Sequence, residues 1–278
     1  MTATDSSGAR AISTPTTADG RGSWLRDFRI AAGRIKVLTA GANLKLDRTL
    51  ASEALIWLGY HAVVRARRLW LAASGRRGVS LWFSPQAPRP WYLVWSALAW
   101  SGGRVAATPD DADAMFAFED ATWSIAAGAA RRAFNFGCAD ISKSRVAAVF
   151  EETFGYPLAV DPTAWISPAV EKSELNGAHD GAIVECPTTA LAGRHYQRFV
   201  DSSDGAFSYD LRTACVGGRP VVVWIKRKAK HARFSVHNLS ATTRRPHEVF
   251  SADELDKISR FLAAMRIDWA GLDILRRG

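Results

Sequence analysis

The pattern of apolar and polar positions along this chain has two periods, which together predict a mixture of helices and strands. Apolar residues recur at spacings of three and four in several segments, as they do on the buried face of an amphipathic helix. Elsewhere they form short runs bounded by glycine, proline and polar residues, which is typical of strands. Helices are predicted over 47–71, 91–100, 142–154 and 251–265, and strands over 35–38, 79–83, 115–118, 170–172, 181–184, 196–200, 211–216, 220–226 and 271–275.

Residues at the ends of these segments support the prediction. Ser142 stands where the cap of the third helix is expected. Ser251 and Glu254 have the spacing of a capping box at the start of the last helix. The dipeptide Gly217-Gly218 separates two strand patterns, so it predicts a tight turn between antiparallel strands.

The length of 278 residues allows one large domain or two smaller ones. We expect two: an α/β N-terminal lobe over 23–130 and a second region with antiparallel sheet over 131–278. Residues 1–22 are rich in Ser, Thr, Ala and Gly and lack an apolar core, so they predict a disordered lead-in and not a signal peptide. The expected fold class is α/β (α+β).

Composition narrows the class of protein without identifying it. Hydrophobic residues make up 48% of the chain and charged residues 23%, which is ordinary globular usage. The three cysteines form no Cys-x-x-Cys pair, so we expect neither disulfides nor a zinc knuckle, and a cytoplasmic location. The apolar segment 54–73 contains Arg65, Arg67 and Arg68, which argue against a membrane span.

Charge points to an anionic partner. The net charge is +9, and many of the basic residues lie between Arg219 and Arg245. In addition, the segment 170–181 places Lys172 on a predicted strand beside a loop that contains Gly177. Such a loop lets backbone N–H groups approach phosphate oxygens while the lysine supplies a positive charge. It is not a Walker loop, because no Gly-Lys-Ser/Thr sequence opens a helix here.

A series of short motifs follows in the second half of the chain. Two are single lysines, Lys143 before the predicted hairpin and Lys172 on it. The others are Gln197-Arg198-Phe199-Val200, Asp210-Leu211-Arg212 followed by Gly217-Gly218 and the basic strand end Lys226-Arg227, then Asn238, and finally Gly271-Leu272-Asp273-Ile274-Leu275.

In this order the motifs resemble the ATP-grasp superfamily, and within it the carboxylate–amine ligases of the branch that adds glutamate to a ribosomal protein. The resemblance covers about 134–275 and implies an ATP-grasp fold preceded by an α/β lobe like the domain that precedes it in the family. It also implies ATP and Mg²⁺ as cofactors, and a small-molecule or peptide carboxylate and an amine as substrates. In the family, ATP phosphorylates the carboxylate and the amine then attacks the acyl phosphate.

The resemblance assigns roles to individual residues. The backbone of 198–200 would contact adenine, while Asp201 would bind the ribose hydroxyls or only shape a turn. The family's second metal-binding strand, Glu/Asp-x-Asn, is not found before Gly278, so we expect an incomplete metal site and impaired catalysis. The implied ATP-binding residues are Lys143, Lys172, Gly177, Gln197, Arg198, Phe199, Val200, Asp201, Asp210, Lys226 and Asn238, the catalytic residues Arg212 and Arg227, and the metal ligand Asp273.

Other interpretations remain open at this stage. A basic nucleic-acid-binding protein would use Arg244, Arg245 and the run 226–233 on phosphates, without ATP-dependent chemistry. Glu119 and Asp120 follow a predicted strand where α/β proteins bind ligands, but a turn-capping role is favoured. The histidines show no metal-ligand spacing, so a zinc enzyme ranks lower. Most tryptophans, namely Trp57, Trp70, Trp82, Trp91, Trp95 and Trp100, are expected in the core and not as stacking platforms.

Overall fold

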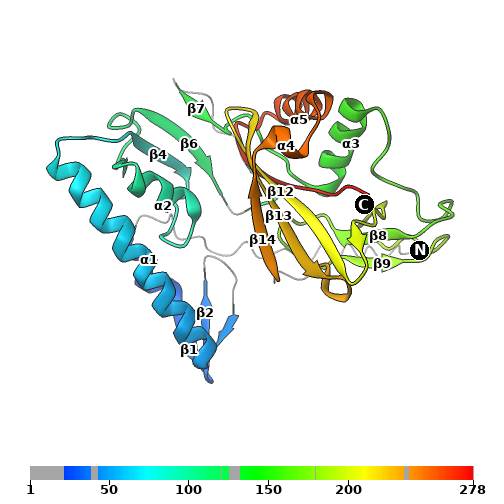
Figure 1. Ribbon diagram of the computed structural model, residues 1–278, viewed down its shortest axis with the longest axis horizontal. Coiled ribbons are helices and arrows are strands. Elements are labelled where there is room, and N and C mark those ends of the chain that lie inside the picture. The colour runs from blue at the N-terminus through cyan, green and yellow to red at the C-terminus, as the bar shows by residue number, and fades with distance from the viewer. Residues whose placement is uncertain are drawn as a thin grey trace, which may run out of the picture. The chain divides into compact units, whose positions relative to one another are not determined.

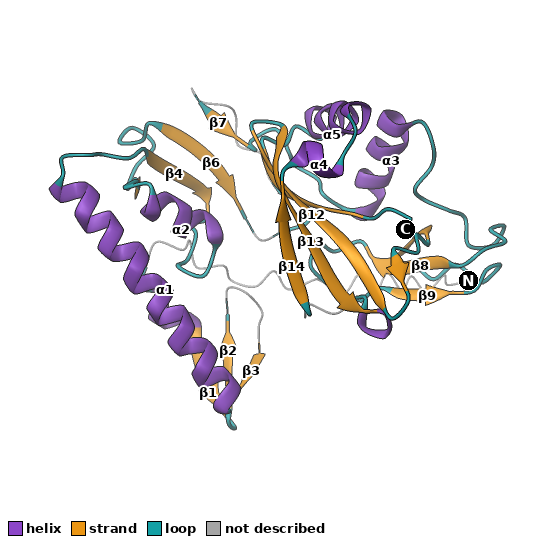
Figure 2. Ribbon diagram, in the orientation of Figure 1, coloured by secondary structure: helices purple, strands orange, loops and turns teal. Residues whose placement is uncertain are grey.

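The computed structural model describes residues 22–38, 43–119, 121–124, 132–178, 180–234 and 238–277. It divides the chain into two compact units, Met1–Asp113 and Ala114–Gly278 (Figure 1). Helices and strands occur in both units, so the α+β class predicted from the sequence is confirmed (Figure 2). The expected lead-in lies outside the described residues except for Gly22, as does 125–131, where the expected lobe boundary falls.

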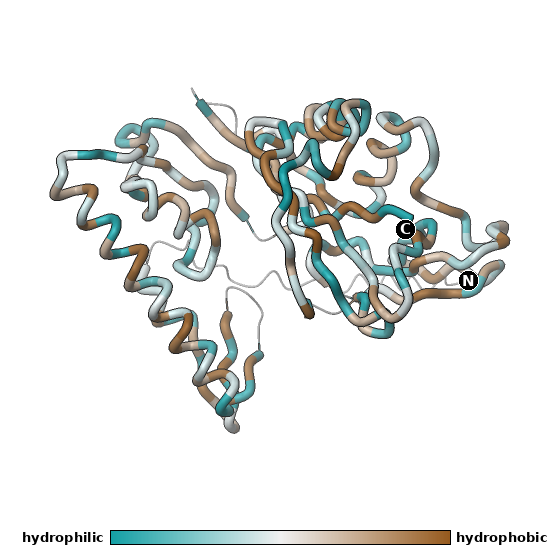
Figure 3. The backbone as a smooth tube through the Cα atoms, viewed as in Figure 1, coloured by the Kyte–Doolittle hydropathy of each residue, from teal (hydrophilic) through white to brown (hydrophobic). Residues whose placement is uncertain are grey.

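The N-terminal unit contains one long helix, α1, which begins where the sequence predicts. The Asp47 carboxylate caps it by accepting a hydrogen bond from the Leu50 backbone N–H at 3.0 Å. Apolar and polar residues alternate along its whole length, as Figure 3 shows. The elements of this unit are η1 (Trp24–Asp27), β1 (Phe28–Ala31), β2 (Arg34–Val37), β3 (Asn43–Lys45), α1 (Arg48–Ala73), β4 (Ser80–Pro85), α2 (Leu93–Trp100) and β5 (Arg104–Val105).

A close approach of two backbone segments and a buried ion pair stabilise this unit. β1, β2 and β3 form an antiparallel sheet, and β4 pairs in parallel with β5. A Cβ on Gly78 would lie 2.4 Å from the backbone nitrogen of Gly103, so only glycine fits there. The Arg89 guanidinium lies 2.6 Å from the Asp27 carboxylate, and each side chain is only 5% exposed.

Two tryptophans of this unit depart from the expected core role. Trp70 is 55% exposed and Trp100 is 45% exposed, whereas Trp57, Trp82, Trp91 and Trp95 are half-buried. The guanidinium of Arg67 lies 4.5 Å from the ring of Trp100, a cation–π contact at the surface. Trp70 lies on α1, where the buried stripe runs through His61, Val64 and Leu71, and Trp100 ends α2, where Ser96, Leu98 and Ala99 are buried.

The C-terminal unit is built around a five-stranded sheet in which β12 pairs with β13, β11 and β15, and β14 forms one edge. The predicted turn at Gly217-Gly218 is confirmed, with φ of 60° and 70° at the two glycines. The elements are β6 (Ala114–Phe118), β7 (Ala133–Phe134), α3 (Lys143–Phe154), β8 (Ala169–Ser173), β9 (Ala182–Val184), β10 (Arg194–Arg198), β11 (Ser203–Asp204), β12 (Phe207–Val216), β13 (Arg219–Ala229), η2 (Lys230–Ala232), β14 (Ser240–Arg244), α4 (Pro246–Val249), α5 (Ala252–Ala264) and β15 (Trp269–Ile274).

One face of the large sheet is covered by helices. α5 packs Ile258 and Leu262 against Val223 and Cys215 of the sheet, and α3 packs against α5 through Val149. Figure 1 shows α3, α4 and α5 on the same side of the sheet. Because side chains alternate along each strand, every second residue of β12, β13 and β15 faces away from these helices. That second face is the one on which charged residues gather.

A smaller antiparallel sheet, β10-β8-β9, completes the unit. The predicted hairpin around 173–180 is confirmed as the β8–β9 connection. The predicted strand 196–200 is partly wrong, because β10 ends at Arg198 and leaves the next residues without strand pairing. β14 and α4 were not predicted, since their sequences are short and mostly polar. Within the described residues, none of the helices combines the length and the apolar character needed to cross a membrane.

Candidate functional site

The central strand of the small sheet carries Lys172. On β8 it is paired directly with His195 of β10, so the two side chains project from the same face of the sheet. Gln197, two residues along β10, shares that face and is buried. Burial, with a smaller contribution from the charge of Lys143, lowers the pKa of Lys172 to about 8.

Lys143 is held beside Lys172 by helix α3. Ser142 caps this helix, as predicted, and its hydroxyl accepts a hydrogen bond from the Arg145 N–H at 3.3 Å. Lys143 is the first residue of the helix and is half-buried. Burial lowers its pKa, while the charges of Glu174 and Asp180 act in the opposite direction.

Among the described residues, the two lysines have no counter-ion in direct contact. Within the described part of the chain, neither ammonium lies within 4.0 Å of a carboxylate. Two positive charges held together and partly removed from water raise the energy of the folded state. Perturbed groups of this kind are common at functional sites, and what this pair lacks is an anion.

The N-terminus of α3 also holds a carboxylate and an imidazole. Glu174 follows β8, and its carboxylate accepts hydrogen bonds from the Ser144 backbone N–H at 2.9 Å and from the Ser144 hydroxyl. His195 Nδ1 lies 3.3 Å from the Ser144 hydroxyl and 3.5 Å from Glu174. Burial, together with Lys172 and Lys143, lowers the pKa of His195, although Glu174 opposes the shift.

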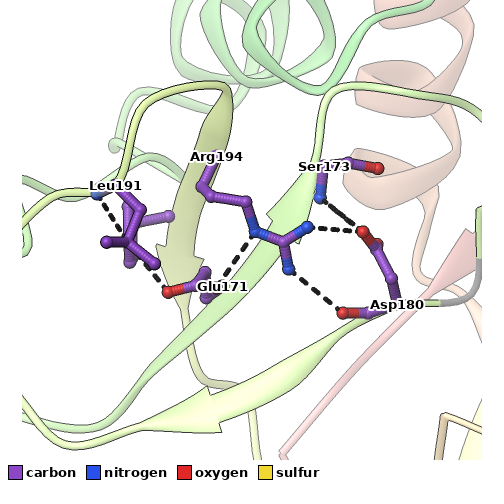
Figure 4. Close-up of polar contacts among 6 residues, drawn as sticks. Glu171, Ser173, Asp180, Leu191 and Arg194 are labelled. Atoms are coloured by element: carbon purple, nitrogen blue, oxygen red, sulfur yellow. Dashed lines mark hydrogen bonds and ion pairs between the residues drawn. The ribbon is translucent and has the colours of Figure 1, made fainter.

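Arg194 fixes the base of the β8–β9 loop, as Figure 4 shows. Its guanidinium donates to Glu171 at 3.0 Å and to the Asp180 carboxylate at 2.5 Å. Asp180 in turn accepts from the Ser173 N–H at 3.2 Å. The guanidinium therefore joins the two ends of the loop, and it keeps the strand that carries Lys172 in register.

The segment that would contact adenine has free backbone groups. In the described structure, Phe199, Val200 and Asp201 make no backbone–backbone hydrogen bond, whereas the Arg198 N–H donates to Leu158 O at 2.9 Å. The Asp201 carboxylate accepts from Ser203 and from Arg233, the latter at 3.1 Å, which is a turn-shaping role. Arg198 itself is half-buried, with its guanidinium 5.3 Å from the ring of Trp165.

Charged residues gather on the face of the large sheet that the helices leave open. The Arg212 guanidinium on β12 lies 2.9 Å from the Asp273 carboxylate on β15, and the Lys226 ammonium on β13 lies 3.8 Å from it. Asp210 on the same face forms an ion pair of 2.7 Å with Lys228. The structure therefore places Asp210, Arg212, Lys226 and Asp273 on one face of the sheet.

Other predicted residues lie apart from this group. Arg227 alternates with Lys226 along β13, so it faces the opposite side, where its guanidinium lies 4.5 Å from the ring of Phe207. Asn238 is an exposed loop residue beside the undescribed 235–237. Gly177 lies in the β8–β9 loop with φ of +71°, which glycine adopts without strain. Glu119 accepts a hydrogen bond from Ser124 at 2.7 Å, and Asp120 is not described.

Asn135 holds β15, and with it Asp273, in place. Its side-chain oxygen accepts from the Asp268 and Trp269 N–H groups at 2.8 and 2.9 Å, and its amide donates to Trp269 O at 2.9 Å. We expect Asn135→Ala to lower the free energy of unfolding by about 3 kcal/mol, roughly 1 for each bond. Urea denaturation would measure this, with Asn238→Ala as an exposed control. An equal change in both variants would contradict the assignment.

Among the described residues of this face, Asp273 is the carboxylate best placed to bind a magnesium ion. Asp273 is 55% exposed, whereas Asp210 is committed to Lys228. Magnesium is commonly held by one or two carboxylates together with phosphates and water, so Asp273 suits an ion that arrives with a nucleotide. To bind the ion, Asp273 would have to give up its ion pair with Arg212. The described residues include no group of three or more His, Cys, Asp or Glu able to hold a metal by themselves.

Sequence reasoning missed Ser144, Glu174 and His195. The alternation of β10 and its pairing with β8 would have placed His195 opposite Lys172, but strand register is not written in a single sequence. A cavity of about 420 Å³ in the same unit lies elsewhere, between the β12–β13 hairpin and α4, and neither lysine lines it.

Of the comparisons with known proteins, only the comparison with solved structures found matches. No family model matches the sequence, and no curated protein matches it. Structures of the ATP-grasp ligase PsnB are similar in part. The complex with a minimal precursor is 15% identical with a TM-score of 0.38, covering 52% of this chain and 51% of that chain. The complex with precursor peptide PsnA2 and AMPPNP is 14% identical with a TM-score of 0.36, covering 53% and 49%.

The chain therefore spans about half the length of the solved structures that it matches. Sequence identities of 14–15% and TM-scores below 0.4 establish neither a shared activity nor a shared ligand. The functional argument therefore depends on the chain's own geometry: an α+β unit with two antiparallel sheets, a pair of lysines with no counter-ion among the described residues, and a charged face on the larger sheet.

Proposed function

We propose that the C-terminal unit is an ATP-grasp nucleotide-binding unit that holds ATP phosphates at Lys143 and Lys172. The observation that carries this is the pair of neighbouring, partly buried ammonium groups with no carboxylate within 4.0 Å in the described structure. ATP carries several negative charges close together, so its phosphates supply what this pair lacks. The lysines act as point charges on the phosphate oxygens.

The segment after β10 supports the same proposal. Phe199, Val200 and Asp201 leave their backbone N–H and C=O groups free of backbone partners in the described structure. An adenine edge offers the matching donor and acceptor. This segment leads directly into β11 and β12, so the adenine would lie next to the strand that carries Asp210 and Arg212.

We further propose ligase chemistry, in which ATP activates a carboxylate and an amine then displaces phosphate. Arg212 and Lys226 would bind and orient the carboxylate to be phosphorylated and stabilise negative charge that develops on the transferring group. Asp273 would release Arg212 and hold magnesium, which when bound would neutralise negative charge on the phosphates. No protein nucleophile is required. The acceptor would be a small-molecule or peptide carboxylate.

Nucleic-acid binding receives no support from the geometry. Lys228 pairs with the half-buried Asp210, and Arg233 pairs with Asp201, so these two charges of the run 226–233 are already partly neutralised by carboxylates. Steep salt-dependent binding of nucleic acid by a chain that ignores ATP would reverse this conclusion.

Isothermal calorimetry with ATP tests the proposed function. We expect ATP to bind, inorganic phosphate to compete weakly, and Lys143→Met to weaken ATP binding by about tenfold, equivalent to 1.4 kcal/mol. Lys257→Met is the matched control, because Lys257 lies on α5 and pairs with Asp253. Equal affinity in wild type and Lys143→Met would remove Lys143 from the site, and no ATP binding would overturn the proposal.

A further inference from the structure

Described residues of the β8–β9 loop hold it to the rest of the unit by hydrogen bonds. At its base, Asp180 is held by Arg194 and by the Ser173 N–H. Further along, the Asn176 N–H donates to the Thr122 hydroxyl at 2.8 Å. The Glu174 carboxylate accepts a hydrogen bond from the first turn of α3. Each of these described loop residues is therefore held to a neighbouring element beside the two lysines.

The Glu174 contact differs from the others because it places a negative charge at an anion-binding position. The carboxylate accepts both the backbone N–H and the hydroxyl of Ser144, in the first turn of a 12-residue helix. N–H groups at such a helix start are unpaired within the helix and carry partial positive charge, which attracts anions. These contacts lower the pKa of Glu174 although burial raises it.

The groups around this carboxylate are those assigned to nucleotide phosphate. Glu174 interacts with Lys143 electrostatically without forming an ion pair within 4.0 Å. It also lies 3.5 Å from His195, which is 8% exposed and whose Nε2 has no hydrogen-bond partner in the described structure. A phosphate arriving at the lysines would meet the charges of Glu174 and Asp180, and of these two carboxylates it is Glu174 that occupies the Ser144 donors.

We propose that Glu174 is an autoinhibitory latch: its carboxylate stands in for phosphate at the start of α3 until a phosphate displaces it. This rests on the proposed nucleotide function. Displacement frees the Ser144 N–H and hydroxyl to donate to phosphate, and it moves the carboxylate away from the incoming negative charge.

Removing the charge of Glu174 is expected to strengthen binding. In Glu174→Gln the side chain keeps its shape and still accepts a hydrogen bond from Ser144, but it no longer repels phosphate. We expect ATP to bind about tenfold more tightly, the size of a like-charge interaction in a partly exposed site. Glu174→Ala should act in the same direction. The control Glu185→Gln makes the same charge change at an exposed position after β9 and should alter affinity by less than about twofold.

The experiment is calorimetric titration of the four chains with ATP and, separately, with tripolyphosphate. Unchanged or weaker ATP binding by Glu174→Gln would overturn the latch while leaving the nucleotide site intact. A second outcome is that tripolyphosphate binds more tightly to Glu174→Gln than to the wild type, while ATP binds no better than tripolyphosphate. This outcome would support the latch and contradict the nucleotide function. Equal gains in Glu174→Gln and Glu185→Gln would reduce the effect to net charge and reject the latch.

Discussion

Replacing Lys172 with methionine is expected to reduce ATP affinity by at least about tenfold, because loss of one partner from a desolvated charge contact costs roughly 2–5 kcal/mol. Lys172 lies on the central strand of the small sheet, and its pKa of about 8 shows how strongly its surroundings disfavour the charged form without an anion. Methionine keeps most of the side-chain volume and removes only the charge. Calorimetry with ATP measures the loss.

The same substitution is expected to stabilise the fold at pH 7. The folded pKa of Lys172 is about 8, below its ordinary 10.5, so its charge opposes folding at every pH below 8 and the penalty disappears as pH rises from 8 to 10.5. Removing the charge should therefore raise the free energy of unfolding at pH 7 by about 2–3 kcal/mol. Urea denaturation at pH 7 measures the change.

Taken together, the two measurements separate a binding lysine from a structural one. A lysine that serves only the fold would lower stability when replaced and leave ATP affinity unchanged. Loss of affinity with a gain of stability is expected only where a charge is kept for a ligand, at a cost to the fold. Lys257→Met, on α5, should change neither quantity appreciably.

Much of the fold could be predicted because local signals and tertiary packing agree. Ser142 and Ser251 cap their helices at the expected positions, and Ser251 forms the predicted capping box with Glu254. The turn at Gly217-Gly218 needs positive φ at both positions, which glycine provides. These features depend on residues near one another in sequence, so a single chain reveals them.

The site was harder to predict because it depends on pairing between distant segments. Lys226 and Arg227 are neighbours in sequence, yet alternation along β13 sends them to opposite faces of the sheet. Likewise, Glu174 and Ser144 meet only because the hairpin docks on α3. A resemblance in motif order can name the segments, but strand register decides which side chains share a face, and register is a tertiary property.

ATP affinity is expected to fall as pH rises through the titration of Lys172. ATP favours the charged lysine, so above the free-state pKa of about 8 each binding event must take up a proton. Affinity should therefore be level between pH 7 and 7.5 and weaken by up to about tenfold per pH unit above 8, with the phosphates already ionised over this range. Burial also lowers the pKa of Lys143, which acts in the same direction. Arginine stays charged throughout, so Lys172→Arg should bind with a nearly flat pH profile even if its affinity is lower. An unchanged slope in Lys172→Arg would assign the proton to another group and remove Lys172 from direct contact with the nucleotide.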